Sequence, residues 1–143
     1  MSLYSAAREL AQSGKRPLEI AAELNIKVML LPFKGIGGIG LSLGQNRFIF
    51  LEASLSEEEQ QLVCGHEMGH FFLHPETNFF FILKNTHYYS RHEYQANRFA
   101  CELMLGEKAA LYGDVIGQAA ASGNMDKMLE VINMLLNECG GWD

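Results

Sequence analysis

The sequence predicts an α+β protein in which helices pack against a small antiparallel three-stranded sheet. Three short β-prone runs lie in the first half of the chain, and runs with the 3.6-residue apolar period of helices lie before and after them. The 143 residues are 48% hydrophobic and 20% charged, which is enough for one core. We therefore expect a single domain over residues 1–143.

The N-terminal part divides into two short helices followed by the sheet. Residues 3–13 have helical character, and Pro17 is placed to begin a second short helix. The run IKVMLL at residues 26–31 favours a strand. The runs GLSL at residues 40–43 and RFIFLE at residues 47–52, with GQN nearby, indicate a hairpin, and the preceding GIGGIG is expected to be a loop.

The strongest helix begins after Ser56. Ser56 and Glu59 form a capping box, acidic residues fill the first turn, and Pro75 ends the helix. Residues 75–90 are expected to be an aromatic-rich loop, and loops of this length inside a compact domain are typically functional. A helix over about residues 91–105 follows. About two more helices complete the chain, the last with an apolar stripe typical of core packing.

The charge and the cysteines limit the class of protein. A net charge of −6 and a pI near 5.3 argue against nucleic-acid binding. The three cysteines are odd in number and form no CxxC pair, so we expect no disulfide framework and a reducing compartment. The sequence has neither a signal peptide nor 18 consecutive apolar residues, so we expect a cytoplasmic protein without a membrane span.

Three of the five histidines lie in VCGHEMGHFFLHP, residues 63–75. His66 and His70 are four residues apart, so on a helix they share a face and can bind one zinc ion. Glu67 lies about 100° round the helix from His66 and can act on a water molecule without being a strong ligand. This is the H-E-x-x-H pattern, in which zinc polarises water and the glutamate is the general base. The pattern predicts His66 and His70 as ligands and Glu67 as the catalytic residue.

The histidine face of this helix is otherwise apolar. Leu62, Gly69 and Leu73 lie on nearly the same side, so we expect the face to be buried, where an imidazole needs a partner. A glycine inside a helix costs about 1 kcal/mol relative to alanine. Gly69 therefore predicts the close approach of another element, for which we expect the helix that carries the third ligand. Cys64 points to the far side and is expected to be a small core residue.

The third zinc ligand has three candidates. A metzincin pattern would need glycine at position 73 and histidine at position 76, where this chain has Leu73 and Glu76, so that pattern is rejected. His74 continues the row of histidines, but its Cα lies about 12 Å from that of His66 on a helix, which strains a shared metal. We expect His74 to interact with the carbonyl groups at the helix end instead.

Glu93, on the following helix, is the third candidate. Ala96 and Ala100 follow it at three and seven residues, and such small side chains let two helices pack closely. Glu93 would then project toward the histidines. The rival role is capping, because Ser90 and Glu93 also form a capping-box pattern at a helix start. Spacing alone leaves both roles open.

The stretch GHEMGHFFLHPETNFFF…NTHYYSRHEYQANRFACELML resembles the ImmA/IrrE family of small zinc metallopeptidases, in the short stand-alone form often found with mobile elements and prophages. The matching features are H-E-x-G-H, L-H-P, N-x-x-F, N-T and E-x-x-A-N-x-F-A, in that order, within residues 25–105. The resemblance implies a zincin-like fold and one Zn²⁺ held, as in gluzincins, by His66, His70 and Glu93. It also implies that Asn97 either hydrogen-bonds a ligand histidine or packs between helices.

The same resemblance implies a regulatory protease. Members of the family typically cleave a partner transcriptional repressor of the helix-turn-helix type, so we expect a zinc metalloendopeptidase. An alternative is a zinc-dependent regulator that binds such a partner without cutting it. A third class is a DNA-binding regulator acting through residues 17–26, against which the acidic balance argues. Gly65, where the family often has Ala, and LMLGEK, where it often has L-L-x-P, depart from the pattern without touching the ligands.

Catalysis also needs a hydrogen-bond donor near the developing oxyanion. His87, Tyr88, Tyr89 and His92 lie in the right stretch of chain and are the candidates. The aromatic residues 79–89 could cover the cleft, engage a partner, or form a lid over the core. The sheet edge offered by the hairpin could hold an extended peptide as an added strand.

Overall fold

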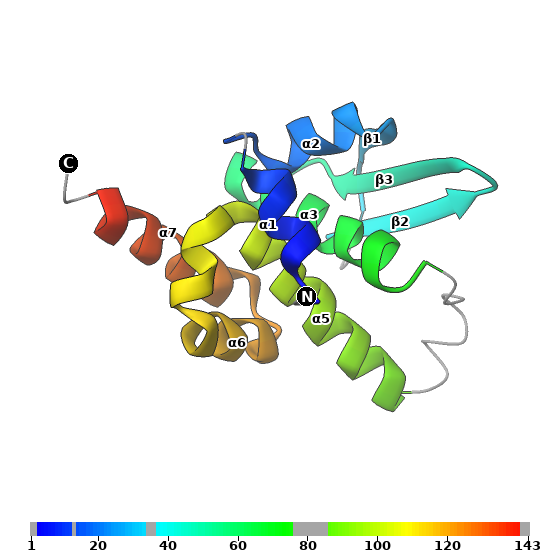
Figure 1. The fold of residues 1–143 in the computed structure, drawn as a ribbon. Helices are drawn as coiled ribbons and strands as arrows, with labels where there is room; N and C mark the ends of the chain where they lie inside the picture. The colour runs from blue at the N-terminus through cyan, green and yellow to red at the C-terminus, as the bar shows by residue number, and fades with distance from the viewer. Residues whose placement is uncertain (1–2, 13, 34–36, 76–85, 141–143) are drawn as a thin grey trace.

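The computed structural model describes residues 3–12, 14–33, 37–75 and 86–140 (Figure 1). The first half contains helices α1 (Ser5–Ala11) and α2 (Pro17–Glu23) and strands β1 (Ile26–Leu31), β2 (Gly38–Leu43) and β3 (Asn46–Glu52). The second half contains α3 (Glu57–Leu73), α5 (Thr86–Leu105), the 3₁₀ helix η1 (Gly106–Leu111), α6 (Gly113–Ser122) and α7 (Met125–Gly140). The α+β class is confirmed.

The sheet is mixed, and the expectation of a fully antiparallel sheet is wrong for β1. The strand order is β1-β3-β2, with β2 antiparallel and β1 parallel to β3. After β1 the chain crosses to the far side of β3 before it turns back through the β2–β3 hairpin, so β1 and β3 run in the same direction. β2 begins at Gly38, inside the glycine-rich run for which the sequence predicts a loop.

Local signals set the start of α3 as expected. The Glu59 N–H donates to Ser56 Oγ at 3.2 Å, and the Ser56 N–H donates to Glu59 Oε1 at 2.8 Å, which completes the capping box. The helix ends at Leu73, before Pro75. Helix α5 begins at Thr86 rather than near residue 91, so the C-terminal end of the predicted loop is helical. Residues 76–85 of that loop lie outside the described residues.

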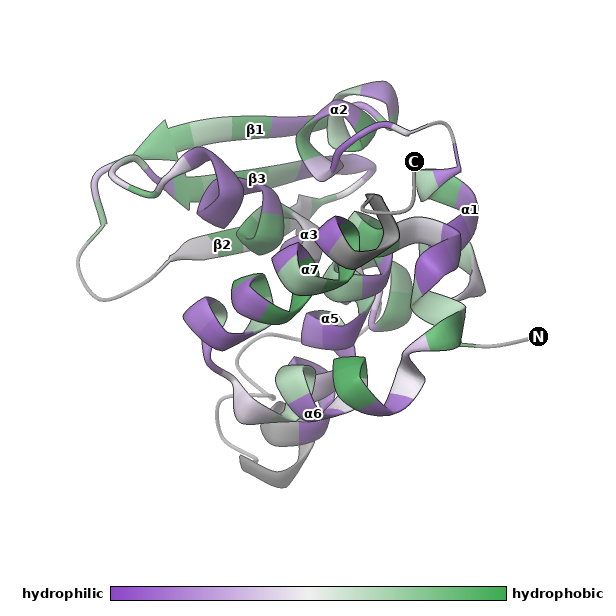
Figure 2. Ribbon diagram, turned by 90° about the vertical axis from the view of Figure 1, so that its left-hand side faces the viewer, coloured by the Kyte–Doolittle hydropathy of each residue, from purple (hydrophilic) through white to green (hydrophobic). Residues whose placement is uncertain are grey.

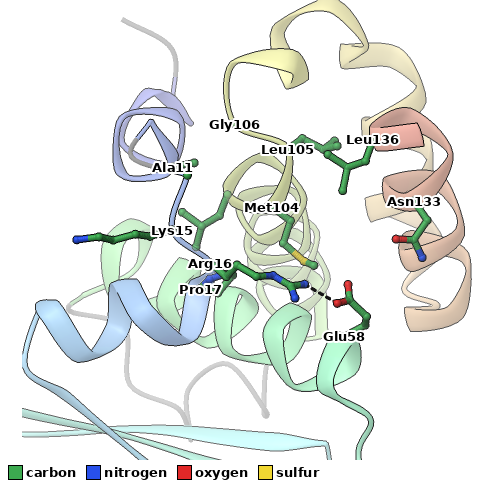
Figure 3. Close-up of a pocket in the computed structure, with 12 residues that line it drawn as sticks. Ala11, Lys15, Arg16, Pro17, Glu58, Met104, Leu105, Gly106, Asn133 and Leu136 are labelled. Carbon is green, nitrogen blue, oxygen red and sulfur yellow. Dashed lines mark ion pairs between the residues drawn. The ribbon is translucent and has the colours of Figure 1, made fainter. Parts of the chain in front are cut away.

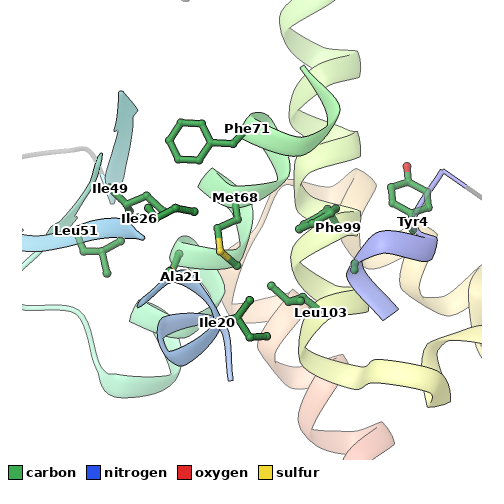
Figure 4. Packing of buried hydrophobic residues seen from close by; sticks show 12 residues of the cluster. Tyr4, Ile20, Ala21, Ile26, Ile49, Leu51, Met68, Phe71, Phe99 and Leu103 are labelled. Carbon is green, nitrogen blue, oxygen red and sulfur yellow. The ribbon is translucent and has the colours of Figure 1, made fainter. Parts of the chain in front are cut away.

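Helix α3 packs against the sheet on one side and against α5 on the other (Figures 1 and 4). One core cluster fills the space between the sheet, α1, α2, α3 and α5; among its members are Ile20, Ile49, Leu51, Met68, Phe71, Phe99 and Leu103. Cys64 belongs to this cluster, as expected. A second cluster joins α5 to η1, α6 and α7, with Ile116, Ile132 and Leu135 fully buried. Helix α5 is therefore buried on two sides, which fixes the position of its side chains.

A buried ion-pair cluster joins the N-terminal helix to α5. Glu102 is completely buried, and its Oε1 accepts from Arg8 Nε of α1 at 2.7 Å. Its Oε2 accepts from Arg98 Nε at 3.4 Å. The guanidinium of Arg98 also lies 4.9 Å from the centre of the Tyr4 ring. Buried carboxylates need such partners, so α1 is held in place by charge as well as by apolar packing.

The strands remain apolar where they reach the surface. Figure 2 shows hydrophobic colouring along β1 and β3, while the helices at the other end mix hydrophobic and hydrophilic residues. Met29, Leu30 and Leu31, at the end of β1, are all exposed. Within the described ranges, no helix combines the length and the apolar character needed to cross a membrane.

Candidate metal centre

Two helices bring three potential ligands together. His66 and His70 lie one turn apart on α3, with ring centroids 4.8 Å apart and the rings edge-on. Glu93 projects from α5, and its Oε2 lies 2.9 Å from His66 Nε2 and 2.7 Å from His70 Nε2. One ligand atom from each residue lies within 4.8 Å of the others. Two imidazoles and one carboxylate are the donor set of catalytic zinc sites, so these residues fit a zinc ion.

Glycines on α3 allow this approach. A Cβ atom on Gly69 would lie 3.0 Å from the Cα of Ala96, and one on Gly65 would lie 3.2 Å from the Cα of Ala100. Both contacts are with the backbone of α5, which cannot yield as a flexible side chain can. The close helix approach expected at Gly69, and the small residues expected opposite it, are confirmed.

The start of α5 bears on the capping role that the sequence left open for Glu93. The helix begins at Thr86, so Ser90 lies inside it and cannot be its N-cap. The Glu93 carboxylate lies against the two imidazoles. The capping interpretation of Ser90 and Glu93 is therefore wrong.

The second ring nitrogen of His66 is held by an amide. His66 Nδ1 lies 2.7 Å from Asn97 Oδ1, and Asn97 Nδ2 donates to the carbonyl oxygen of Ala120 in α6 at 3.1 Å. Because the amide nitrogen is used by Ala120, its oxygen faces the ring, and His66 Nδ1 is the donor. Asn97 thus contacts both His66 and α6, so it hydrogen-bonds the histidine and also lies at a helix–helix contact, the two roles considered for it.

His74 does not contact the carbonyl groups at the helix end through its ring, and that expectation is wrong. Its Nδ1 lies 3.3 Å from His70 Nδ1, and its Nε2 lies 2.7 Å from Gln95 Oε1 on α5. Burial, together with His92 and His70 nearby, outweighs the hydrogen bond to Gln95 and lowers the pKa of His74 to about 4. The ring is therefore neutral at pH 7, and it lies behind His70 rather than in the three-residue cluster.

Electrostatics at the cluster favour a positive charge. Burial disfavours the charged form of His66, but the hydrogen bond to Glu93 and the carboxylates of Glu67 and Glu93 outweigh it and raise the pKa of His66 to about 9. Burial acts to raise the pKa of Glu93, yet the hydrogen bonds from His66 and His70 leave it well below its usual range. The carboxylates that raise the pKa of His66 would favour a metal cation at the same place.

Glu67 lies between the cluster and the sheet. It is 9% exposed, and its Oε2 lies 4.0 Å from His66 Nε2, farther than the Glu93 oxygen. On its other side is β2, where a Cβ atom on Gly40 would lie 2.9 Å from Glu67 Oε1. The carboxylate therefore lies beside the three-residue cluster without belonging to it.

The four candidates for an oxyanion donor fall into two groups. His92 is buried, and its ring stacks on that of His74, with centroids 3.8 Å apart and planes 17° apart. His87, Tyr88 and Tyr89 have helical backbone in α5, but their side chains lie outside the described residues. Of the aromatic residues 79–89, those before residue 86 lie wholly outside them.

The sequence interpretation missed two contacts around the site. Gln95 belongs to no recognised motif. Its contact with His74 depends on how α3 and α5 align, which the sequence does not show. Gly40 closes the glycine-rich run interpreted as a loop and opens the β-prone run at residues 40–43. The sequence did contain a signal for this contact, because a glycine in a strand often marks the close approach of another group.

A separate pocket of about 400 Å³ lies between α1, α2, α3, α5 and α7 (Figure 3). Its charged groups are paired: Arg16 Nη2 lies 2.7 Å from Glu58 Oε1, and Lys15 pairs with Glu23. Glu58 is in the first turn of α3, about 12 Å along the helix from His66. The pocket is therefore not part of the metal cluster.

The fold and the site define a class. A small mixed sheet lies over a helix with H-E-x-x-H, and the next helix supplies a glutamate, which is the zincin-like arrangement of the gluzincin type. Residues 21–112 match the family described as the IrrE N-terminal-like domain of peptidase family M78, and the chain belongs to this family. The resemblance inferred over residues 25–105 is confirmed.

One curated relative comes from a bacteriophage. The "Uncharacterized immunity region protein 2" of Bacillus phage phi105 is 36% identical over 93 residues, which are 62% of this chain and 58% of that protein. The chain thus matches less than two thirds of that relative's length. No solved structure matches the chain.

Proposed function

We propose that the protein is a zinc-dependent endopeptidase that regulates a partner protein by cutting it. The observation that carries the proposal is the convergence of His66, His70 and Glu93 on one point, with the Glu67 carboxylate beside them. Membership of a peptidase family supports the same activity. When bound, zinc with three protein ligands and an open position polarises a water molecule or a substrate carbonyl group.

Each residue of the site has a part in that reaction. His66, His70 and Glu93 hold the metal. Glu67 accepts a proton from the attacking water as general base and can later deliver it to the leaving amine. Its position between the ligands and β2 puts the carboxylate within reach of a peptide lying along the sheet edge.

Strand β2 supplies an edge for the substrate. In the described part of the sheet it has one neighbour, β3, so its other side has backbone N–H and C=O groups available for an added strand. Gly40 lies in this strand opposite Glu67. An extended peptide paired with β2 would therefore pass the general base.

The partner we propose is a helix-turn-helix repressor. The implication comes from the family resemblance, in which small members cleave such repressors. The printed name of the phage relative, an immunity region protein, agrees with that setting. The net charge of −6 favours a protein substrate over direct nucleic-acid binding.

The test is Glu67→Gln. Glutamine has nearly the same shape but cannot accept the proton, and it leaves the three ligands unchanged. We expect the variant to fold, to bind one zinc ion and to bind the partner, but to cut it at least about 100-fold more slowly, the lower end for loss of a general base. The measurement is the rate of fragment formation from a candidate helix-turn-helix repressor, such as one encoded beside the gene, at equal zinc occupancy. Glu130→Gln, an exposed change on α7, is the matched control.

Three outcomes separate the possibilities. Equal rates for Glu67→Gln and wild type would contradict the role of Glu67. Tight, zinc-dependent partner binding with no cleavage by the wild type would favour the regulator that does not cut. Zinc bound with full affinity by the His66→Ala/His70→Ala variant would show that the metal lies elsewhere.

A further inference from the structure

An arginine lies near the hairpin end of the sheet, on the face that α3 covers. Arg47 of β3 pairs in register with Ser42 of β2, and Ile49 pairs with Gly40. Cross-strand partners lie on the same face of a sheet, and side chains two residues apart on a strand share that face. Ile49 is completely buried in the core beside α3. Arg47 and Ser42 therefore lie on this same face, next to the strand edge proposed for the substrate.

One aromatic ring separates Arg47 from the proposed general base. The guanidinium carbon of Arg47 lies 5.5 Å from the centre of the Phe71 ring. Phe71 reaches from α3 toward the sheet (Figure 4). A Cβ atom on Gly40 would lie 3.2 Å from the Phe71 ring and 2.9 Å from Glu67 Oε1, so the ring and the carboxylate approach the same point of β2. The cation is thus at the end of a short row that begins at Glu67.

Arg47 has its charge available for a ligand. Arg8, Arg16 and Arg98 each pair with a glutamate, whereas Arg47 forms no ion pair within the described part of the chain. Stacking on a ring uses the flat face of a guanidinium group, so the N–H groups at its edge remain able to donate. Arg47 is partly exposed, and Ser42 beside it is exposed. A carboxylate can therefore reach this fork of donors and accept two hydrogen bonds from it.

The other face of β2 is apolar. Ile39, Leu41 and Leu43 lie there, out of phase with Gly40. Leu41 and Leu43 are exposed. A strand added to β2 would place alternate side chains beside these apolar residues and the intervening ones on the face of Arg47. Its sequence should then have an acidic residue at one position, with apolar residues on either side of it.

We propose that Arg47 selects substrates that have an aspartate or a glutamate close to the bond that is cut. The acidic residue lies opposite Ser42, two residues from the one that passes Gly40 and Glu67, which is about 7 Å along the strand. The inference rests on the endopeptidase proposed above and adds the chemistry of the sequence that it cuts. Because the net charge of the chain is −6, the protein as a whole disfavours an acidic segment, and only a local cation favours one.

The first test compares the cleavage preferences of variants on a library of decapeptides with randomised sequences. The zinc-loaded full chain is incubated with the library, and the fragments are sequenced by mass spectrometry. We expect acidic residues to be enriched about fivefold over their amides at one position near the cut, the upper end for a partly exposed ion pair. The enrichment should disappear in Arg47→Gln. In Arg47→Glu, lysine and arginine should be enriched at the same position instead.

Lys27→Glu is the matched control. It makes the same change of charge in the same sheet, but Lys27 lies over the ring of Phe48, 5.7 Å from its centre, on the face away from α3. We expect its cleavage preferences to match those of the wild type at equal zinc content. If Lys27→Glu loses the acidic preference as Arg47→Gln does, the preference follows overall charge and the inference is wrong.

A binding measurement separates this inference from the proposed cleavage. The probes are fluorescein-labelled decapeptides in which valine alternates with serine and a central serine is replaced by glutamate or by glutamine. The protein is zinc-loaded Glu67→Gln, which lacks the general base and retains Arg47. We expect the glutamate peptide to bind about fivefold more tightly than the glutamine peptide, as fluorescence anisotropy can measure. Adding Arg47→Gln should remove the difference, and adding Lys27→Glu should not.

The two measurements distinguish a failure of this inference from a failure of the proposed function. If the wild type cuts no peptide but the binding preference is present and depends on Arg47, the proposed cleavage is not supported and the role of Arg47 in recognition stands. If the library is cut without an acidic preference, or if Arg47→Gln slows the cleavage of all peptides equally, Arg47 only supports the Phe71 ring and the inference is overturned. The absence of a preference in both measurements also overturns it.

Discussion

Helix α3 meets α5 on one side and β2 on the other, and the two contacts are built differently. Toward α5, a Cβ atom on Gly69 would lie 3.0 Å from the Cα and 3.1 Å from the carbonyl oxygen of Ala96. Toward β2, a Cβ atom on Gly40 would meet the ends of side chains, Glu67 Oε1 at 2.9 Å and the Phe71 ring at 3.2 Å. The contact with α5, which we call the ligand side, therefore involves main-chain atoms. The contact with β2, which we call the base side, involves side chains that can move. Substitutions on the two sides should separate metal binding from catalysis.

The largest effect is expected from removing two ligands. His66→Ala/His70→Ala should abolish zinc binding at this site and, with it, any cleavage. A ligand bound only by the folded state stabilises it by about 2.7 kcal/mol at 100 times its dissociation constant. We expect zinc to raise the melting temperature of wild type and to leave that of the double variant unchanged, as scanning calorimetry can measure. A zinc-dependent shift of equal size in the variant would contradict the assignment.

The ligand side should also respond to pH. The folded pKa of His66 is raised to about 9, so between pH 6 and 8 the metal-free site carries a proton that zinc must displace. Zinc affinity should then increase about tenfold per pH unit, or about 100-fold over this range. Chelator competition at pH 6, 7 and 8 measures it.

The metal-free protein should become less stable as the pH rises, whereas its affinity for zinc increases. A raised folded pKa contributes stability that is complete below the unfolded value of 6.5 and is lost as the pH rises through about 9. Denaturant unfolding in the presence of a chelator tests this. In the zinc-binding experiment, an affinity for zinc that does not vary between pH 6 and 8 would contradict the displacement of a proton from His66.

A methyl group on the ligand side should weaken metal binding and stability together. Gly69→Ala gains about 1 kcal/mol of helix propensity, but overpacking against backbone costs about 1–3 kcal/mol. Because α3 and α5 must separate, Glu93 moves away from the histidines, and we expect about tenfold weaker zinc binding. Gly117→Ala in α6 is the matched control, since its Cβ atom would have only ordinary contacts, 3.4 Å or more. Unchanged affinity in Gly69→Ala would show that the backbone contact does not set the ligand geometry.

The smallest effect is expected on the base side. Gly40→Ala forces the Glu67 carboxylate and the Phe71 ring to shift, both of which can move at little cost in stability. We expect zinc affinity within a few-fold of wild type and cleavage slower by up to about tenfold, because the general base is displaced. Parallel measurement of the dissociation constant and of the cleavage rate tests the separation. A loss of affinity as large as that of Gly69→Ala would remove the distinction between the two sides.

Features that depend on residues close together in the sequence could be predicted, whereas contacts between distant segments could not. The capping box at Ser56, the shared face of His66 and His70, and the close approach at Gly69 all follow from helix periodicity within one segment, and the structure has each of them. The direction of β1 could not be predicted, because a short strand does not reveal which strand it will pair with. The contact of His74 with Gln95 depends on where α5 starts and how it aligns with α3.

The family match covers residues 21–112, but contacts that complete the structure cross both boundaries. Arg8 lies before the first and pairs with Glu102, while the Ala120 carbonyl that anchors Asn97 lies after the second. Removing one partner of a buried ion pair costs about 3–5 kcal/mol, and the partial exposure of Arg8 points to the lower end. Small proteins have only about 5–15 kcal/mol in total. We therefore expect a fragment limited to residues 21–112 to fold poorly. The segment that matches the family is shorter than the segment needed for a stable fold.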